Sequence, residues 1–190
     1  MASLVLSGDT SGSITVSAPA VAGSTTQTLV NVTGTLAPIV SGTAVTASGT
    51  SVDFTGIPSW AKRITVMLSG VSTNGSSNIL VQVGAGSFAT TGYLGSTSVL
   101  TTVVGTSNYT NGLAVATANA AASVVNGLAV ICNVSGNVWA MNTATGYSNG
   151  AGTMVGASNI SLGGVLDRVR ITTVNGTDTF DAGTINIIYE

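Results

Sequence analysis

The sequence predicts an all-β fold, and three of its features support this prediction. Apolar residues alternate with polar ones over short segments, and clusters of Gly, Asn, Ser and Thr separate these segments. Only residues 113–123 are rich enough in alanine to favour a helix, and the Thr, Val and Asn residues among them weaken it, so we predict strand or loop there. An antiparallel β-sandwich with jelly-roll-like winding is therefore the predicted architecture.

Residues 52–68 organise this prediction. Residues 56–59, Gly-Ile-Pro-Ser, are typical of a turn because proline fixes φ and glycine relieves the crowding beside it. From Arg63 onward every second side chain is apolar, which predicts a strand with one face in a core. We expect Trp60 to cap that core, with Lys62 and Arg63 at its wet rim. A structural hairpin corner is favoured here over a ligand site.

The chain divides into two parts by composition. Residues 1–48 hold only short apolar segments between Ser-, Thr- and Gly-rich connections, which predicts an extended β shaft that is stable only when several chains stack. A flexible linker is the alternative. Residues 49–190 hold longer strands and predict an independent sandwich head. Its expected strands are 52–55, 63–68, 79–83, 98–104, 122–134 with an interruption near Gly127, 138–142, 169–174 and 184–189.

Charge is scarce, at 5% of residues, and no Asp, Glu, Lys or Arg occurs between Arg63 and Asp167. A protein surface with so little charge should be covered by other copies of the chain, or should consist largely of hydroxyl and amide groups. Four basic residues and a net charge of −2 leave no electrostatic footprint for nucleic acid. The N-terminus has no basic region and no long apolar run, so we expect synthesis in a cytoplasm, with no signal peptide and no membrane insertion.

Catalytic and metal-binding constellations are missing from the sequence. It has no histidine and a single cysteine, Cys132, so neither the common nucleophilic triads nor a usual zinc site can form, and we expect no enzyme activity, cofactor or metal. Asp178 and Asp181 lie three residues apart in a predicted hairpin loop. Aspartate is favoured in turns because it hydrogen-bonds its own backbone, and a weak Ca²⁺ site is the less favoured alternative.

Arg168 and Arg170 should share one face of a strand. Their predicted partners are Asp167, Asp53 or Glu190. A structural ion pair is the favoured interpretation, and a site for a receptor phosphate or uronate is the alternative.

The uncharged middle of the chain is the better candidate for recognition. Its loops carry aromatic rings beside neutral donors and acceptors, a mixture suited to sugars, and the candidate receptor contacts are Tyr93, Tyr109, Trp139 and Tyr147. Non-binding β domains have similar loops. Trp139 also alternates with Val138 and Ala140, which is compatible with a place in the core.

Three stretches resemble known proteins. LSGDTSGSITVSAPAVAGSTTQTL at residues 6–29 resembles a segment of tailed-bacteriophage fibre proteins. SVDFTGIPSWAKRITVMLSGVSTNG at residues 51–75 and DRVRITTVNGTDTFDAGTINIIYE at residues 167–190 are similar to C-terminal head domains of such tail fibres. The resemblance does not extend over residues 79–162.

The resemblance implies a homotrimeric virion protein whose N-terminal part binds other virion proteins and whose C-terminal β domain contacts a glycan or protein on the host surface. Fibres of this type often carry a sizeable anchoring domain before the shaft, whereas here Met1 is followed almost directly by shaft-like sequence. A capsid decoration or head-fibre protein bound to the shell through residues 1–48 is therefore the alternative. An enzyme acting on surface polysaccharide ranks well below both.

Overall fold

The computed structural model describes residues 3–7, 10–17, 38–102 and 104–190. The chain forms two compact units, residues 1–36 and 37–190. In the described ranges there is no helix, and hence no helix long and apolar enough to cross a membrane. Much of the predicted shaft, residues 18–37, lies outside the described residues.

The first unit contains a β-hairpin. Strands β1 (Ser3–Ser7) and β2 (Ser13–Ser17) pair antiparallel, with Ser3 opposite Ser17. Val5, Leu6, Ile14 and Val16 are each more than half exposed. Among the residues that the structure describes, this hairpin encloses no core of its own.

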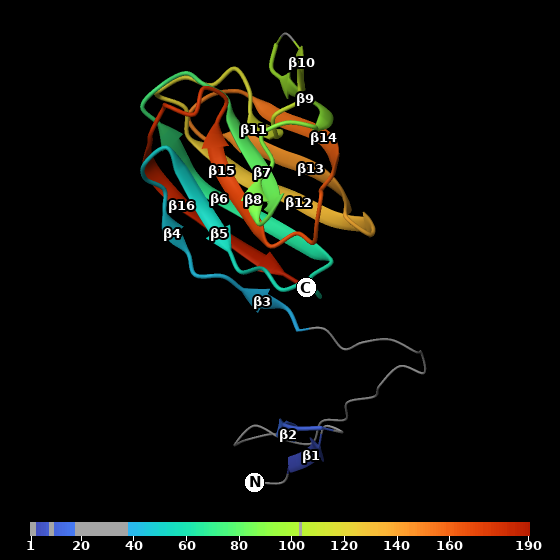
Figure 1. The fold of residues 1–190 in the computed structure, drawn as a ribbon. Coiled ribbons are helices and arrows are strands. Elements are labelled where there is room, and N and C mark those ends of the chain that lie inside the picture. The colour runs from blue at the N-terminus through green and yellow to red at the C-terminus, as the bar shows by residue number, and fades with distance from the viewer. Residues whose placement is uncertain (1–2, 8–9, 18–37, 103) are drawn as a thin grey trace. The chain divides into compact units, whose positions relative to one another are not determined.

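The second unit contains a large sheet of nine strands (Figure 1). In spatial order these are β10 (Gly105–Tyr109), β9 (Leu94–Leu100), β14 (Thr153–Ser161), β13 (Val138–Tyr147), β12 (Val125–Ser135), β6 (Arg63–Thr73), β16 (Phe180–Tyr189) and β3 (Val40–Ser41), while β4 (Val45–Thr46) also pairs with β16. All of these pairings are antiparallel.

A small sheet of five strands covers one face of the large one (Figure 1). Its order is β11 (Leu113–Ala116), β7 (Ile79–Ala85), β15 (Arg168–Thr173) and β5 (Ser51–Thr55), with β8 (Ser87–Phe88) paired to β7, and it too is antiparallel. The predicted all-β, antiparallel, sandwich-like fold is thus confirmed, and jelly-roll winding stays a prediction.

The core lies between the two sheets. Ile64, Val66 and Ile131 of the large sheet and Val81 and Val169 of the small sheet are completely buried in one cluster. Buried and less buried residues alternate along β6 up to Leu68, as expected of a strand with one face in the core.

Two strand predictions need correction. The segment 98–104 is not one strand, because β9 ends at Leu100 and β10 begins at Gly105, and these two strands pair as a hairpin. Strand β14 was not predicted, because Gly156 and Ser158 occupy positions along it where an apolar alternation would be expected.

Two other local predictions are confirmed. The interruption of the segment 122–134 appears as a register shift between Val125 and Gly127, where Gly127 has a φ of +133°. The alanine-rich segment 113–123 forms strand β11 followed by turns, not a helix.

The boundary between the two units falls after Leu36, earlier than the boundary expected at residue 48. Strands β3 and β4 hydrogen-bond to β16, and the Ala47 N–H donates to the Gly183 carbonyl at 2.9 Å. These edge strands are too short to be recognised from sequence, and only their pairing with β16 assigns them to the sandwich.

The predicted corner at residues 56–59 is a turn. Gly56 has a φ of +76°, and the Ala61 N–H donates to the Pro58 carbonyl at 3.0 Å. Trp60 does not seal the core as expected, because it is 40% exposed and packs on Tyr189 with ring centroids 5.7 Å apart.

Candidate functional site

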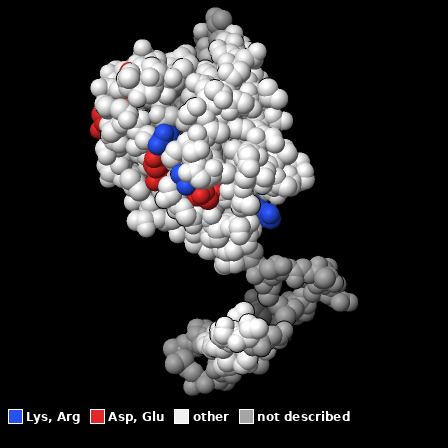
Figure 2. Space-filling view, in the orientation of Figure 1, with Lys and Arg blue, Asp and Glu red and all other residues white. Residues whose placement is uncertain are grey.

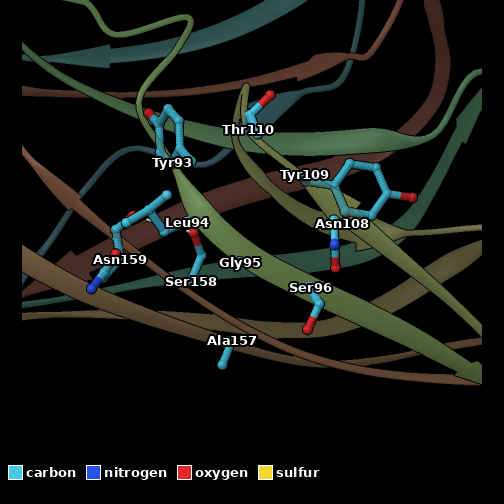
Figure 3. Close-up of a pocket in the computed structure, with 10 residues that line it drawn as sticks. All are labelled: Tyr93, Leu94, Gly95, Ser96, Asn108, Tyr109, Thr110, Ala157, Ser158 and Asn159. Carbon is cyan, nitrogen blue, oxygen red and sulfur yellow. Dashed lines mark hydrogen bonds between the residues drawn. The ribbon is translucent and has the colours of Figure 1, made fainter.

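An open hollow of about 570 Å³ lies on the large sheet where β9, β10 and β14 meet (Figure 3). We call it the uncharged hollow, because no Asp, Glu, Lys or Arg lines it. Its lining residues are Tyr93, Leu94, Gly95, Ser96, Asn108, Tyr109, Thr110, Ala157, Ser158 and Asn159.

Gly95 allows β9 and β14 to approach closely beneath the hollow. A Cβ atom at this position would lie 2.4 Å from the Ser158 Cβ and 2.6 Å from the Ala157 carbonyl oxygen. Both distances are too short for a side chain, so glycine is required for this strand pairing. A larger residue would push the two strands apart and deform the hollow.

Two of the predicted contact residues, Tyr93 and Tyr109, border the hollow, but their hydroxyl groups serve the fold. The Tyr93 hydroxyl accepts a hydrogen bond from the Val83 N–H at 2.7 Å, and its side chain is completely buried. Burial raises the pKa of Tyr93 to about 12. Tyr109 is 8% exposed, its hydroxyl accepts a hydrogen bond from the Asn78 amide at 2.8 Å, and burial raises its pKa.

The accessible lining comes from residues that the sequence did not single out. Leu94, Ser96, Asn108, Ala157 and Asn159 are all exposed. Asn and Ser offer neutral donors and acceptors, and Leu and Ala offer apolar contact. The lining holds no carboxylate, imidazole or thiol, and its polar side chains are hydroxyls and amides that can exchange hydrogen bonds with a ligand.

The other two predicted contacts lie elsewhere. Trp139 is 4% exposed and belongs to the core cluster, so its assignment as a receptor contact must be corrected in favour of the core role. Tyr147 is partly buried and donates its hydroxyl proton to the Thr117 carbonyl at 2.7 Å. Burial raises the pKa of Tyr147 to about 12. Neither residue lines the uncharged hollow, so the four predicted contacts do not form one site.

The charged residues of β15 form a compact cluster on the outer face of the small sheet. The Arg170 guanidinium donates two hydrogen bonds of 2.7 Å to the Asp53 carboxylate. The Arg168 guanidinium donates hydrogen bonds of 2.7 and 3.0 Å to the Asp167 carboxylate. The Arg170 guanidinium carbon also lies 4.0 Å from the ring centroid of Phe88. Figure 2 shows blue and red atoms side by side near the middle of a surface that is mostly white, with a few further red and blue atoms towards its edges.

This geometry favours the predicted structural ion pairs over a site for phosphate or uronate. A bidentate carboxylate already occupies the fork of each guanidinium that an anionic ligand would need. Arg170 also lines a second hollow of about 340 Å³, together with Gln82, Asn111 and Thr172. We call it the arginine hollow.

Asp178 has the turn role predicted for it. Its carboxylate accepts hydrogen bonds from the Ser77 N–H at 2.9 Å and from the Asn175 amide at 2.7 Å. These bonds, chiefly that from Asn175, lower the pKa of Asp178. Asp181 is exposed on β16, and within the described part of the chain no three His, Cys, Asp or Glu residues come together as a metal site.

Comparison with known proteins found no matching family model, no matching curated protein and no matching solved structure.

Sequence reasoning missed the uncharged hollow because its signal is weak. Asn108 and Asn159 are two of many Asn residues in a chain rich in polar residues, and nothing local distinguishes them. The aromatic residues Tyr93 and Tyr109 were recognised in the sequence. They line the hollow, but both side chains are buried.

Proposed function

We propose that this protein is a trimeric, fibre-like structural protein of a bacteriophage virion, whose β-sandwich contacts the host cell surface without catalysis. The observation that carries the proposal is a sandwich with an open, chargeless hollow, preceded in the chain by a separate hairpin whose apolar side chains are exposed. In this proposal the sandwich with its hollow is the binding head, and the hairpin with its exposed apolar side chains is the attachment segment. The resemblance of residues 6–29, 51–75 and 167–190 to tail-fibre segments supports the same assignment.

The uncharged hollow is the proposed receptor contact, and a neutral glycan is the proposed receptor class. A sugar offers many hydroxyl groups and apolar ring faces but no charge, and the exposed Asn108, Ser96 and Asn159 can exchange hydrogen bonds with hydroxyls beside the apolar Leu94.

A fluorescent fusion of the full chain tests this contact. It should label susceptible cells, and Asn108→Ala and Asn159→Ala should each weaken the labelling because each removes an amide from the hollow. Asn111→Ala is the matched control, since it makes the same change at the arginine hollow. If Asn111→Ala abolished labelling while the other two variants bound normally, the contact would belong at the arginine hollow.

A capsid decoration or head-fibre protein is the alternative, favoured by the exposed apolar side chains of the separate N-terminal hairpin. In that case the hairpin would hold the protein on the shell. Cryo-electron microscopy of the virion distinguishes the two, because the protein would appear on the capsid instead of the tail. The same result together with unlabelled cells would refute the receptor-binding assignment.

A further inference from the structure

The outer face of the large sheet carries an apolar row that no part of the described chain covers. Met67, Leu128, Ala144 and Val155 lie directly opposite one another on the adjacent strands β6, β12, β13 and β14. Leu128 is 46% exposed and Val155 44% exposed. Cross-strand neighbours on one face are in contact range, so these side chains form one continuous apolar surface.

The next row on this face is also without charge. Thr65, Val130, Asn142 and Ala157 follow in register across the same four strands. One row further, Arg63 is charged, but it lies at the end of β6 and pairs with Glu190. An apolar centre with short neutral polar residues around it is the composition of an interface core.

The two outer faces of the sandwich differ in their content of charged residues, and a protein that stays monomeric would not need this difference. The small sheet presents Asp53, Arg168 and Arg170 to solvent, whereas charge on the large sheet is confined to Arg63 at the start of β6 and Asp181 near the start of β16, and strands β9, β12, β13 and β14 contain no charged residue. Charge keeps free protein surfaces apart, so the chargeless face is the one suited to being covered.

The size of this face fits association with copies of the chain. Strands β6, β12, β13 and β14, which carry both rows, contain 9 to 11 residues each. At a spacing of about 4.8 Å and a rise of about 3.4 Å per residue they present about 650 Å², which lies within the range of about 600–1,000 Å² per partner of a standard interface.

We infer that the outer face of the large sheet, centred on Met67, Leu128, Ala144 and Val155, is the surface through which copies of this chain pack against one another. The occupant is a second copy because strands β12, β13 and β14 offer no charge to select a different partner, and two sheet faces pack about 10 Å apart. The inference rests on the proposed function only for the number of copies. The uncharged hollow shares Ala157 with this face but lies towards the β9–β10 margin of the sheet, so its exposed amides can remain at the rim of such an assembly.

In a trimer each chain shares this face between two neighbours. Each pair of chains then buries about half of the standard area per partner, so the sandwich alone should associate more weakly than the full chain, in which the hairpin adds contacts.

Light scattering of the full 18.6 kDa chain tests the inference. The wild type should have the mass of a trimer, and Leu128→Glu and Val155→Glu should each reduce it to that of a monomer because a buried unpaired charge opposes packing. Val174→Glu is the matched control, since Val174 is 43% exposed but lines the arginine hollow on the small-sheet side, and this variant should stay trimeric. Circular dichroism should show the same fold in all four proteins, and Leu128→Gln replaces a Glu variant that fails to fold.

The single thiol gives a second measurement without altering the face. Cys132 lies opposite Ala140 on this sheet, in the row that contains Arg63. A thiol reagent should therefore modify Cys132 severalfold more slowly in the wild type than in Leu128→Glu.

The outcomes separate this inference from the proposed function. A monomeric wild type would overturn both the trimeric fibre and the packing face. An oligomeric wild type that survives both Glu substitutions, with Cys132 equally reactive throughout, would overturn the packing face alone.

Discussion

The buried hydroxyl of Tyr93 supports the strand that carries the uncharged hollow, and Tyr93→Phe tests that support. The substitution keeps the ring and removes only the hydroxyl, which accepts a hydrogen bond from the Val83 N–H at 2.7 Å and donates one to the Val83 carbonyl at 3.3 Å. The Val83 carbonyl keeps its bond from the Ala89 N–H at 2.9 Å, so one buried backbone group loses its partner. Leaving a single buried donor unpaired costs about 1–3 kcal/mol of unfolding free energy near neutral pH.

The pH dependence of this difference follows from the pKa of Tyr93. Burial raises that pKa to about 12 in the folded protein, whereas an unfolded tyrosine titrates near 10. Below pH 10 both states keep the proton. As the pH rises from about 10 to about 12, the unfolded chain releases the proton first, which lowers the stability of the wild type by up to about 2.7 kcal/mol. Phenylalanine cannot ionise, so the advantage of the wild type over Tyr93→Phe should shrink across this window.

Urea unfolding monitored by circular dichroism at pH 8, 10 and 11 measures both quantities. Tyr189→Phe is the control, since it keeps the ring that packs on Trp60. A difference between wild type and Tyr93→Phe that stays constant from pH 8 to pH 11 would refute the buried, protonated hydroxyl. A loss below about 0.5 kcal/mol at pH 8 would refute the hydrogen bond to Val83.

Four further outcomes are expected. Trp139→Ala should lower the unfolding free energy by about 3–5 kcal/mol, measured by urea titration, because the side chain fills the core; a stable variant would return Trp139 to the surface candidates. Arg170→Ala should cost only about 1 kcal/mol by the same measurement, since its ion pair and its contact with Phe88 are partly exposed, and a larger loss would show a deeper structural role. Lowering the pH through 4 should destabilise the wild type, because a carboxyl whose pKa is lowered on folding stabilises only while ionised, and Asp178→Asn should reduce this acid sensitivity in urea midpoints between pH 5 and 3. Residues 37–190 expressed alone should unfold cooperatively, as a unit with its own core does, and a broad, non-cooperative melt would contradict the boundary at Leu36.

The sequence alone determined the features that depend on neighbouring residues. The alternation that begins at Arg63, the turn at residues 56–59 and the interruption near Gly127 were predictable because side-chain period and backbone φ are local properties. The lack of charge between Arg63 and Asp167 likewise pointed to a covered or neutral surface before any strand was placed. The ion partners of Arg168 and Arg170 could be narrowed to three acids by elimination, because the chain has so few.

Only the tertiary structure decided which residues meet. Arg170 joins Asp53, 117 residues away in the chain, because β15 and β5 pair in one particular register. The uncharged hollow forms because β14 pairs with β9 and not with another strand, and this choice depends on packing across the whole core. The same packing turns Tyr93 inward, although its polar surroundings in the sequence resemble those of an exposed loop. Strand pairing and burial depend on residues far apart in the chain. In a chain rich in Ser, Thr, Asn and Gly, local sequence therefore predicts the strands, whereas the site forms only in the complete fold.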